Sequence, residues 1–388
     1  RKLDRVGVGY EIDAKWGGPK APAGGDAGDA DETGDDHINT FLELKRANME
    51  FTLPGTETTV KSGLQWISLP SVALGSNPVL AGDMGGVVVS TPVSETADLT
   101  FGWSRGLNND NSANAAPGLD SFFASLPFEQ DGFSVSPFAM YTLIGQDARS
   151  GPGYTASRFS GFNDDADAYW LGSGFDINAF DPIGIQAGFI YGAINADEDA
   201  NEQSGWYADL KATYNMEYMT PAVYAMYSSG NDDDADTDGS GRMPAIYHDG
   251  LTSPYPSMMI GDSTYLGIGG DGNAGVSLLT YDPTGIWTVG AKLSEIVLSD
   301  NLTGTINVGY YQGTNDSEAP IGGKSAFTDE DSAYDITVAT NYKIYEQLSA
   351  ICEAGYAKAD FDDDAPSRPN NYKDEPATKI GVGLLYSF

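Results

Sequence analysis

Apolar and polar residues alternate with a period of two in segments spread along the whole chain, and stretches with the 3.6-residue period of a helix are nearly absent. In "ETADLTFGWSR" (95–105), every second residue from Ala97 to Trp103 is apolar, and the residues between them are polar or glycine. The segment "GWYADLKATYN" (205–215) repeats this pattern from Trp206 to Tyr214. Each such segment is about ten residues long, which is the length of a tilted strand that crosses a membrane.

The connections between these segments alternate between two lengths. The short ones include "LPGTE" (53–57), "NAFDP" (178–182), "NMEYM" (215–219), "SEIVLSD" (294–300) and "KIYEQ" (343–347). The long ones are rich in Asp, Gly, Asn and Pro, and they cover residues 17–36, 145–165, 230–283, 314–331 and 360–371. Tight turns at one rim and long loops at the other are typical of an outer-membrane barrel, whereas a soluble sandwich has shorter strands.

The sequence therefore predicts an all-β fold, a transmembrane up-and-down antiparallel β-barrel with short periplasmic turns and long extracellular loops. We expect about 16 strands, within a range of roughly 16–18. We also expect one domain that spans residues 1–388.

The composition excludes several classes of function. The chain has 56 acidic and 20 basic residues and a formal net charge of −36, which repels a phosphate backbone and argues against a nucleic-acid partner. The single cysteine, Cys352, leaves no intrachain disulfide or redox pair. With only two histidines in the chain, acid–base catalysis by histidine is also not expected. The sequence thus predicts that the protein is not an enzyme.

The chain ends in "TKIGVGLLYSF" (378–388), in which every second residue from Ile380 to Phe388 is apolar. In a closed barrel the last strand pairs with the first, and its apolar parity faces lipid. Tyr386 and Phe388 would then lie in an aromatic girdle at the membrane surface. The alternative is an ordinary antiparallel strand that happens to end the chain.

Residues on the opposite parity would point into a water-filled lumen. The expected pore-lining cations are Arg46, Lys61, Lys211, Lys292 and Lys379, and the expected anions are Glu11, Asp13, Glu50, Asp98, Asp209, Asp335 and Glu353. Charges of both signs around a bore select solutes by charge and size. The excess of acids, together with acidic loops at the mouth, predicts a preference for cations. The alternative is that these residues are solvated wall positions without a role in selectivity.

The loop "DADTDGSGRMPA" (234–245) begins like a calcium-binding loop, but Ala245 takes the place of the bidentate glutamate, so an EF-hand is not expected. Repulsion among neighbouring aspartates still favours a hard cation with oxygen ligands. The sequence predicts calcium in the extracellular loops, with Asp232, Asp234, Asp236 and Asp238 as ligands. A solvated acidic loop is the alternative, and no cofactor is required for function.

Two other motifs carry little weight. Gly267, Gly269 and Gly272 have the GxGxxG spacing of a dinucleotide site, but no helix follows to receive a pyrophosphate. His37 and His248 lie in or beside Asp-rich sequence without a recognisable catalytic partner.

Several stretches resemble Gram-negative outer-membrane porins, and more narrowly the homotrimeric porin family of sulfate-reducing bacteria. These stretches are "ELKRANMEFTLPGTETTVKSGLQWISLP", "NPVLAGDMGGVVVS", "DGFSVSPFAMYTLIG" and the terminal "LLYSF". They cover mainly the first 145 residues and the end of the chain. The resemblance implies a passive, water-filled channel that forms a homotrimer in the cell outer membrane, in contact with lipid and lipopolysaccharide.

Three functions stay open at this point. The first is a general diffusion porin for small hydrophilic solutes and ions. The second is a substrate-selective channel of the same architecture, with the long loop 230–283 folded inward. The third is a soluble secreted β-protein that binds calcium or glycan through its acidic loops.

Overall fold

A computed structural model describes residues 6–16, 40–105, 119–145, 166–235, 237–248, 259, 285–318, 327–362 and 374–387. The strands are β1 (Val6–Trp16), β2 (Thr40–Thr52), β3 (Thr59–Ser68), β4 (Leu80–Ser94), β5 (Ala97–Arg105), β6 (Leu119–Ser125), β7 (Phe128–Gln130), β8 (Phe133–Ile144), β9 (Ala166–Phe180), β10 (Ile183–Asn195), β11 (Gln203–Tyr214), β12 (Thr220–Ser228), β13 (Tyr247–His248), β14 (Ile286–Ser299), β15 (Leu302–Gly313), β16 (Ser332–Tyr345), β17 (Leu348–Asp360) and β18 (Ala377–Tyr386). A short 3₁₀ helix, η2, covers Asp199–Asn201. Among the described residues, no helix is long and apolar enough to cross a membrane.

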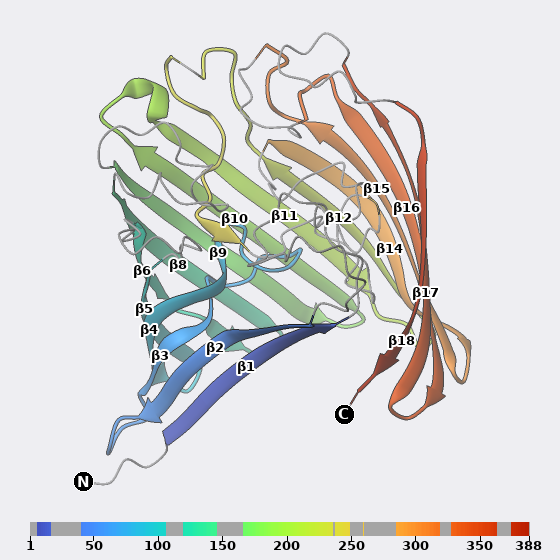
Figure 1. Cartoon of the computed structure of the whole chain (residues 1–388), viewed down its shortest axis with the longest axis horizontal. Coiled ribbons are helices and arrows are strands. Elements are labelled where there is room, and N and C mark those ends of the chain that lie inside the picture. The colour runs from blue at the N-terminus through green and yellow to red at the C-terminus, as the bar shows by residue number, and fades with distance from the viewer. Residues whose placement is uncertain are drawn as a thin grey trace, which may run out of the picture.

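The strands form one antiparallel wall in which each strand pairs with its neighbours along the chain (Figure 1). Two departures from a simple count are present. β6 and β7 both pair with β5 and β8, so together they fill one place in the wall. β13 is only two residues long and pairs in parallel with β4, while β12 pairs directly with β14. The eighteen strands of the described residues therefore occupy sixteen places around the wall, within the predicted range of 16–18.

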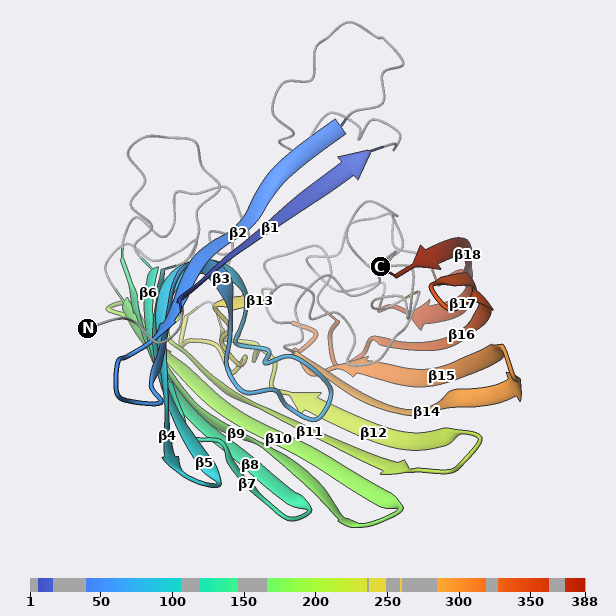
Figure 2. The ribbon, with the colours of Figure 1, turned by 90° about the horizontal axis from the view of Figure 1, so that it is seen from below.

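Seen from below, the wall curves around a central space (Figure 2). The seam lies between β1 and β18, because within the described residues no backbone pairs join these two strands. The predicted pairing of the last strand with the first is thus not present in the described part of the chain.

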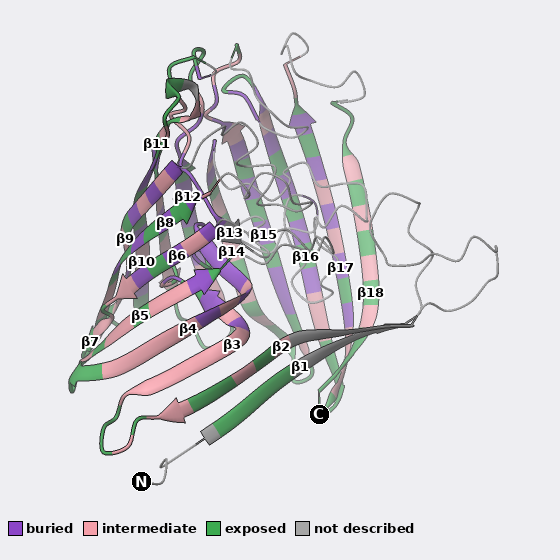
Figure 3. Ribbon diagram, turned by 60° about the vertical axis from the view of Figure 1, so that its left-hand side comes forward, coloured by how far each residue is buried: buried purple, intermediate pink, exposed green. Residues whose placement is uncertain are grey.

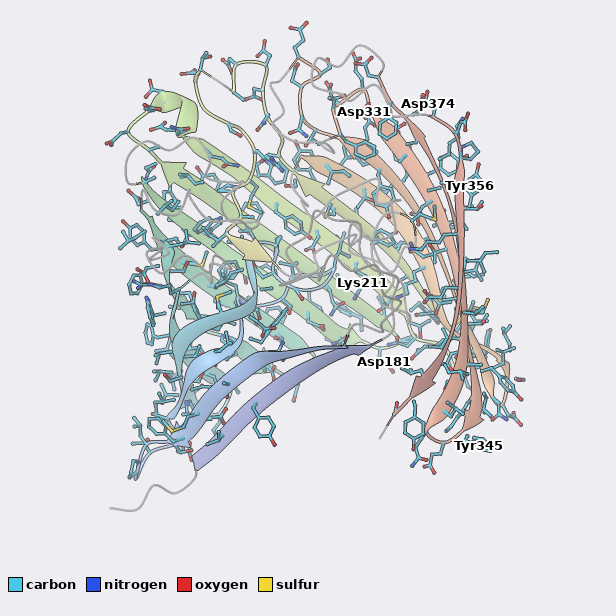
Figure 4. All side chains as sticks on the ribbon, viewed as in Figure 1. Asp181, Lys211, Asp331, Tyr345, Tyr356 and Asp374 are labelled. Carbon is cyan, nitrogen blue, oxygen red and sulfur yellow. The ribbon has the colours of Figure 1, made fainter. Side chains whose placement is uncertain are left out.

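The two rims differ as the sequence predicts. Short turns join β2 to β3, β4 to β5, β9 to β10, β11 to β12, β14 to β15 and β16 to β17. The connections on the other rim are longer, and they include residues 69–79, 229–285 and 314–331. Figure 4 labels Tyr345 near the short-turn rim and Asp331 and Asp374 near the long-loop rim. Strands that run alternately between a rim of turns and a rim of loops define an up-and-down barrel.

Buried and exposed residues alternate along the strands (Figure 3), and many of the exposed residues on the outer face are large and apolar. On β18, Ile380, Val382 and Leu384 are 71–75% exposed, as the parity of the C-terminal segment predicts. On β12, Val223 is 61% exposed. An outward-facing band of large apolar side chains at alternate strand positions is typical of a barrel that crosses a membrane. The fold is therefore a transmembrane β-barrel.

Aromatic side chains form a girdle on this outer face near the long-loop rim. Ring pairs join neighbouring strands: Trp206 stacks on Tyr227 with centroids 4.4 Å apart, and Trp287 lies 5.4 Å from Tyr310. The pairs Tyr169–Tyr191 and Tyr334–Tyr356, at 6.3 and 6.1 Å, extend the girdle in both directions. Near the other rim, Tyr386 is 56% exposed, as expected for a girdle residue, and Phe388 lies outside the described residues. Such belts place amphipathic rings at the membrane–water interface.

Inside the barrel, buried apolar side chains form a cluster against the wall that extends from β3 to β17. Phe138, Trp170 and Ile190 belong to it, and the last two are 0% exposed. Chain segments from the long-loop rim complete this cluster, and they include Leu74 and Met243. Much of the inner face is therefore packed like the core of a soluble protein, and this packing helps to hold the segments that enter the lumen.

Candidate functional site

The lysines that the sequence assigns to the lumen do point inward. On β11, Lys211 is half-buried between the outward Leu210 and Ala212, and on β14 Lys292 is half-buried between the exposed Ala291 and Leu293. Figure 4 shows Lys211 on the wall of the barrel. Lys61 on β3 and Lys379 on β18 are half-buried and share the inward parity of their strands.

A polar network lies on the inner face of β12 to β15. Tyr224 on β12 donates a hydrogen bond from its hydroxyl to Oδ1 of Asn307 on β15, at 3.2 Å. Lys211 is the register partner of Tyr224, and Lys292 is the register partner of Asn307. Lys211 and Lys292 are also close enough to interact electrostatically. This stretch of wall therefore carries two ammonium groups beside a phenol and an amide.

Two predicted anions point inward but are buried. Asp335 on β16 and Glu353 on β17 are both 0% exposed. They lie beyond the lysines around the wall, and Asp335 interacts electrostatically with Tyr224. The wall from β11 to β17 therefore passes from a basic to an acidic stretch.

Asp209 was predicted to face the water of the lumen, and this is wrong. Its side chain points inward from β11 but is only 5% exposed, because residues 69–79 cover it. We call these residues, which connect β3 to β4, the strap. The backbone amides of Ala73 and Leu74 donate hydrogen bonds to the two carboxylate oxygens of Asp209, at 3.2 and 2.9 Å. The carboxylate is thus an anchor for an inward loop, and the alternation of β11 alone could not reveal this contact.

A second segment from the long-loop rim enters the barrel beside the strap. We call residues 242–248 the inner segment, and it belongs to the connection between β12 and β14. Trp170 Nε1 donates a hydrogen bond to the carbonyl of Pro244 at 2.8 Å, and the amide of Ile246 donates to the carbonyl of Val79 at 3.0 Å. The segment then pairs with β4 as β13. The prediction that part of loop 230–283 folds inward is confirmed for these residues.

Arg46 does not line the pore. Its guanidinium lies 5.4 Å from the ring centroid of Trp66 and forms an ion pair with Asp83, and both partners lie on the parity opposite to the buried Gln65 and Met84. The pairing of β2 with β3 begins only at Ala47, so Arg46 lies just beyond it and has no register partner on β3 that fixes the face of its side chain.

The other predicted anions divide into two groups. Glu50 and Asp98 are exposed, and Glu50 is the register partner of the inward Lys61. Glu11 and Asp13 belong to β1, but their side chains lie outside the described part of the structure.

Three of the four predicted calcium ligands line one cleft at the long-loop rim. The cleft has a volume of about 460 Å³, and Asp232, Asp234 and Asp238 share its lining with Tyr169 and Tyr191. Asp236 lies outside the described residues. Across the described ranges, no three histidine, cysteine or acidic side chains are grouped so that they could hold a metal ion. Calcium binding therefore stays a prediction.

Some sequence features cannot be placed. The glycines at 267, 269 and 272 and His37 lie outside the described residues, and of His248 only the backbone, in β13, is described.

The sequence of the strap contains a sign of burial that the analysis of alternation missed. A loop exposed to water seldom contains four large apolar residues, yet Leu69, Val72, Leu74 and Val79 follow one another within eleven positions, and all four are buried.

Acidic side chains gather around the mouth of the barrel between β15 and β16. Asp331 is buried there and accepts hydrogen bonds from the amides of Thr328 and Asp362, at 2.7 and 2.8 Å. Its neighbour Glu330 is fully exposed to solvent, and the negative charge of Asp362 raises the pKa of its carboxyl above the ordinary value. The mouth therefore repels anions at neutral pH.

The chain matches no protein-family model and no curated protein sequence. Its structure is similar to that of a double-substituted form of OccD1 (OprD), with a TM-score of 0.52 and 12% identity over 98% of this chain and 85% of that one. Two proteins of Pseudomonas aeruginosa, the outer membrane protein OprD and OccK11 (OpdR), give TM-scores of 0.49 at 12% and 11% identity, with 98% and 99% of this chain and 83% and 86% of theirs covered. The similarity to OccD1 is one of fold alone, and it supports the barrel that the strand pairing defines.

Proposed function

We propose that this protein is a channel of the outer membrane that admits small hydrophilic solutes and ions through the lumen of the barrel. The apolar outer band and the aromatic girdle support insertion in a membrane. The half-buried lysines of the inner wall support a polar path.

The observation that carries the proposal furthest is the crossing of the lumen by the strap and the inner segment. These two segments are hydrogen-bonded to the wall at Asp209 and Trp170 and to each other at Val79. A lumen narrowed by fixed chain segments can discriminate between solutes by shape and hydrogen bonding as well as by size. This favours a substrate-selective channel over a general diffusion porin.

A liposome-swelling assay distinguishes the two functions. The purified protein is reconstituted and exposed to pairs of solutes of equal size but different charge or hydroxyl arrangement. A selective channel gives different swelling rates within a pair, whereas a general porin gives rates that follow size alone. The absence of swelling with every small solute would contradict both functions.

The resemblance to homotrimeric porins also leads us to propose a homotrimer in contact with lipopolysaccharide. Native mass spectrometry of the detergent-solubilised protein tests this, and a mass equal to one chain would contradict it.

A further inference from the structure

Asp209 holds the strap through an unusual set of contacts for a residue on a barrel wall. Its carboxylate accepts hydrogen bonds from two consecutive backbone amides, at Ala73 and Leu74, and from the hydroxyl of Tyr207 at 3.0 Å. A carboxylate that is 5% exposed is stable only when such donors replace the water that it has lost. The contact is also specific in geometry, because both oxygens are used and the two donors are adjacent in the chain.

The wall beneath the strap is shaped to receive it. At Gly174 on β9, a Cβ atom would lie 2.2 Å from the carbonyl oxygen of Ser71. At Gly188 on β10, a Cβ atom would lie 2.6 Å from Cβ of Val72. The strap therefore lies directly against the backbone of β9 and β10 at these glycines, and it is hydrogen-bonded to β11 through Asp209. A side chain at either glycine would push the strap toward the axis of the barrel.

The tip of the strap packs its apolar side chains Val72 and Leu74 into the buried cluster, but among the described residues it has few other hydrogen bonds. Its ends are tied by the hydrogen bond from the amide of Leu69 to the carbonyl of Leu80 and by the contact of Val79 with Ile246. Between these ends, the backbone groups of Val72 and Gly75 form hydrogen bonds with each other and with no other residue that the structure describes. Among the described residues, Asp209 is the one wall side chain that forms hydrogen bonds with the strap between Val72 and Gly75.

We infer that Asp209 is the positioning residue that sets the width of the channel and hence its discrimination between solutes. This inference rests on the proposed function, because a strap can set a width only if solutes pass through the lumen. When Asp209 loses its acceptor oxygens, the tip of the strap loses its hydrogen bonds to the wall and becomes mobile. The hydrogen bonds at the two ends of the strap remain. The lumen then becomes wider and fluctuates, although the wall keeps its strand pairing.

Conductance of single channels in a planar bilayer tests the inference. Asp209→Ala removes both acceptors, and Asp209→Asn keeps one, so we expect larger conductance and larger open-channel noise in the order wild type, Asn, Ala. The size limit for uncharged sugars is expected to be lost in the same order. Glu95→Gln is the control, because this carboxylate lies in the short turn between β4 and β5, away from the strap, and its loss should leave noise and size limit unchanged.

Two further measurements distinguish a positioning role of Asp209 from a role in folding alone. The folded fraction of each variant, read from its migration on an unheated gel, should equal that of the wild type. In a Cys352→Ser background, Val72→Cys and Gly188→Cys added to Asp209→Ala allow a disulfide between strap and wall, since a shift of about 1 Å brings the Cβ atoms to disulfide distance. Oxidation should restore low noise, and reduction should abolish it again.

The possible failures are distinct. If the folded wild-type protein does not conduct, the proposed function is wrong. If the wild type conducts but Asp209→Ala has the same noise, conductance and size limit, the channel stands and the positioning role of Asp209 is wrong. If the oxidised cysteine pair does not restore low noise, the strap is not the element that Asp209 controls.

Discussion

Tyr224 and Asn307 are joined by a hydrogen bond that spans β14, the strand between their own two strands. Gly290 makes this possible, since a Cβ atom there would lie 2.2 Å from the hydroxyl oxygen of Tyr224. The bridge lies between Lys211 and Lys292, which are the register partners of its two ends. The polar part of the inner wall is therefore a fixed arrangement in which two cations flank a rigid hydrogen bond.

The first prediction concerns these lysines. Replacement of Lys211 and Lys292 by glutamine should increase the preference of the channel for cations. The substitutions remove two positive charges from the wall, whereas the acidic residues on β16 and β17 remain. The reversal potential in a gradient of potassium chloride measures this preference. Lys343→Gln, at the short-turn rim, is the control and should change little. A shift toward anions in the double variant would contradict the inward placement of the two lysines.

The second prediction concerns the outer band. Leu384→Arg should lower the free energy of unfolding by roughly 2–4 kcal/mol if residue 384 lies at the bilayer midplane, and by less near a rim. Leu384→Ala loses apolar area without adding a charge, so its cost should be smaller. Urea titration of the protein folded into lipid vesicles provides both values. Equal stability of the arginine and alanine variants would mean that this parity of β18 does not face lipid.

The third prediction concerns pH at the mouth. Because neighbouring carboxylates raise the pKa of Glu330, this residue takes up a proton at a higher pH than an ordinary glutamate. Negative charge at the mouth should therefore fall early as the pH is lowered, and the cation preference should fall with it. In Glu330→Gln the decline should begin at lower pH, whereas Glu57→Gln, on a short turn at the other rim, should behave like the wild type. Identical pH profiles of the reversal potential in all three proteins would contradict a role for Glu330.

The fourth prediction concerns calcium. If the acidic loop binds a cation, titration of calcium into chelator-treated protein should release or absorb heat, and Asp234→Asn and Asp238→Asn should reduce the signal. Glu95→Gln, in the short turn between β4 and β5, is the control. Heat that these aspartate substitutions leave unchanged would place any calcium elsewhere.

The alternation of the sequence was sufficient to predict the wall. A period of two fixes which face each side chain of a strand occupies, so the outward Leu384 and the inward Lys211 followed directly from parity. The prediction failed for Arg46, which lies where the pairing of β2 with β3 ends. The alternation of a sequence does not show where the pairing of two strands ends.

The strap could not be predicted for a different reason. Asp209 and Leu74 are 135 positions apart, and no local pattern reports a hydrogen bond between a side chain and a distant backbone amide. The prediction of Asp209 as a water-facing anion assumed an empty lumen. The apolar residues of the strap showed that it needs burial, but only the fold shows which part of the wall receives it.

The most direct test of the account is the single-channel conductance of the purified, folded wild-type protein in a planar bilayer. The account predicts discrete conductance steps, with a current that favours cations at low salt and loses this preference as salt screens the acidic mouth. It also predicts that small neutral sugars reduce the conductance by entering the lumen and that larger sugars do not. Folded protein that inserts without any conductance steps would contradict the claim that this barrel is a channel.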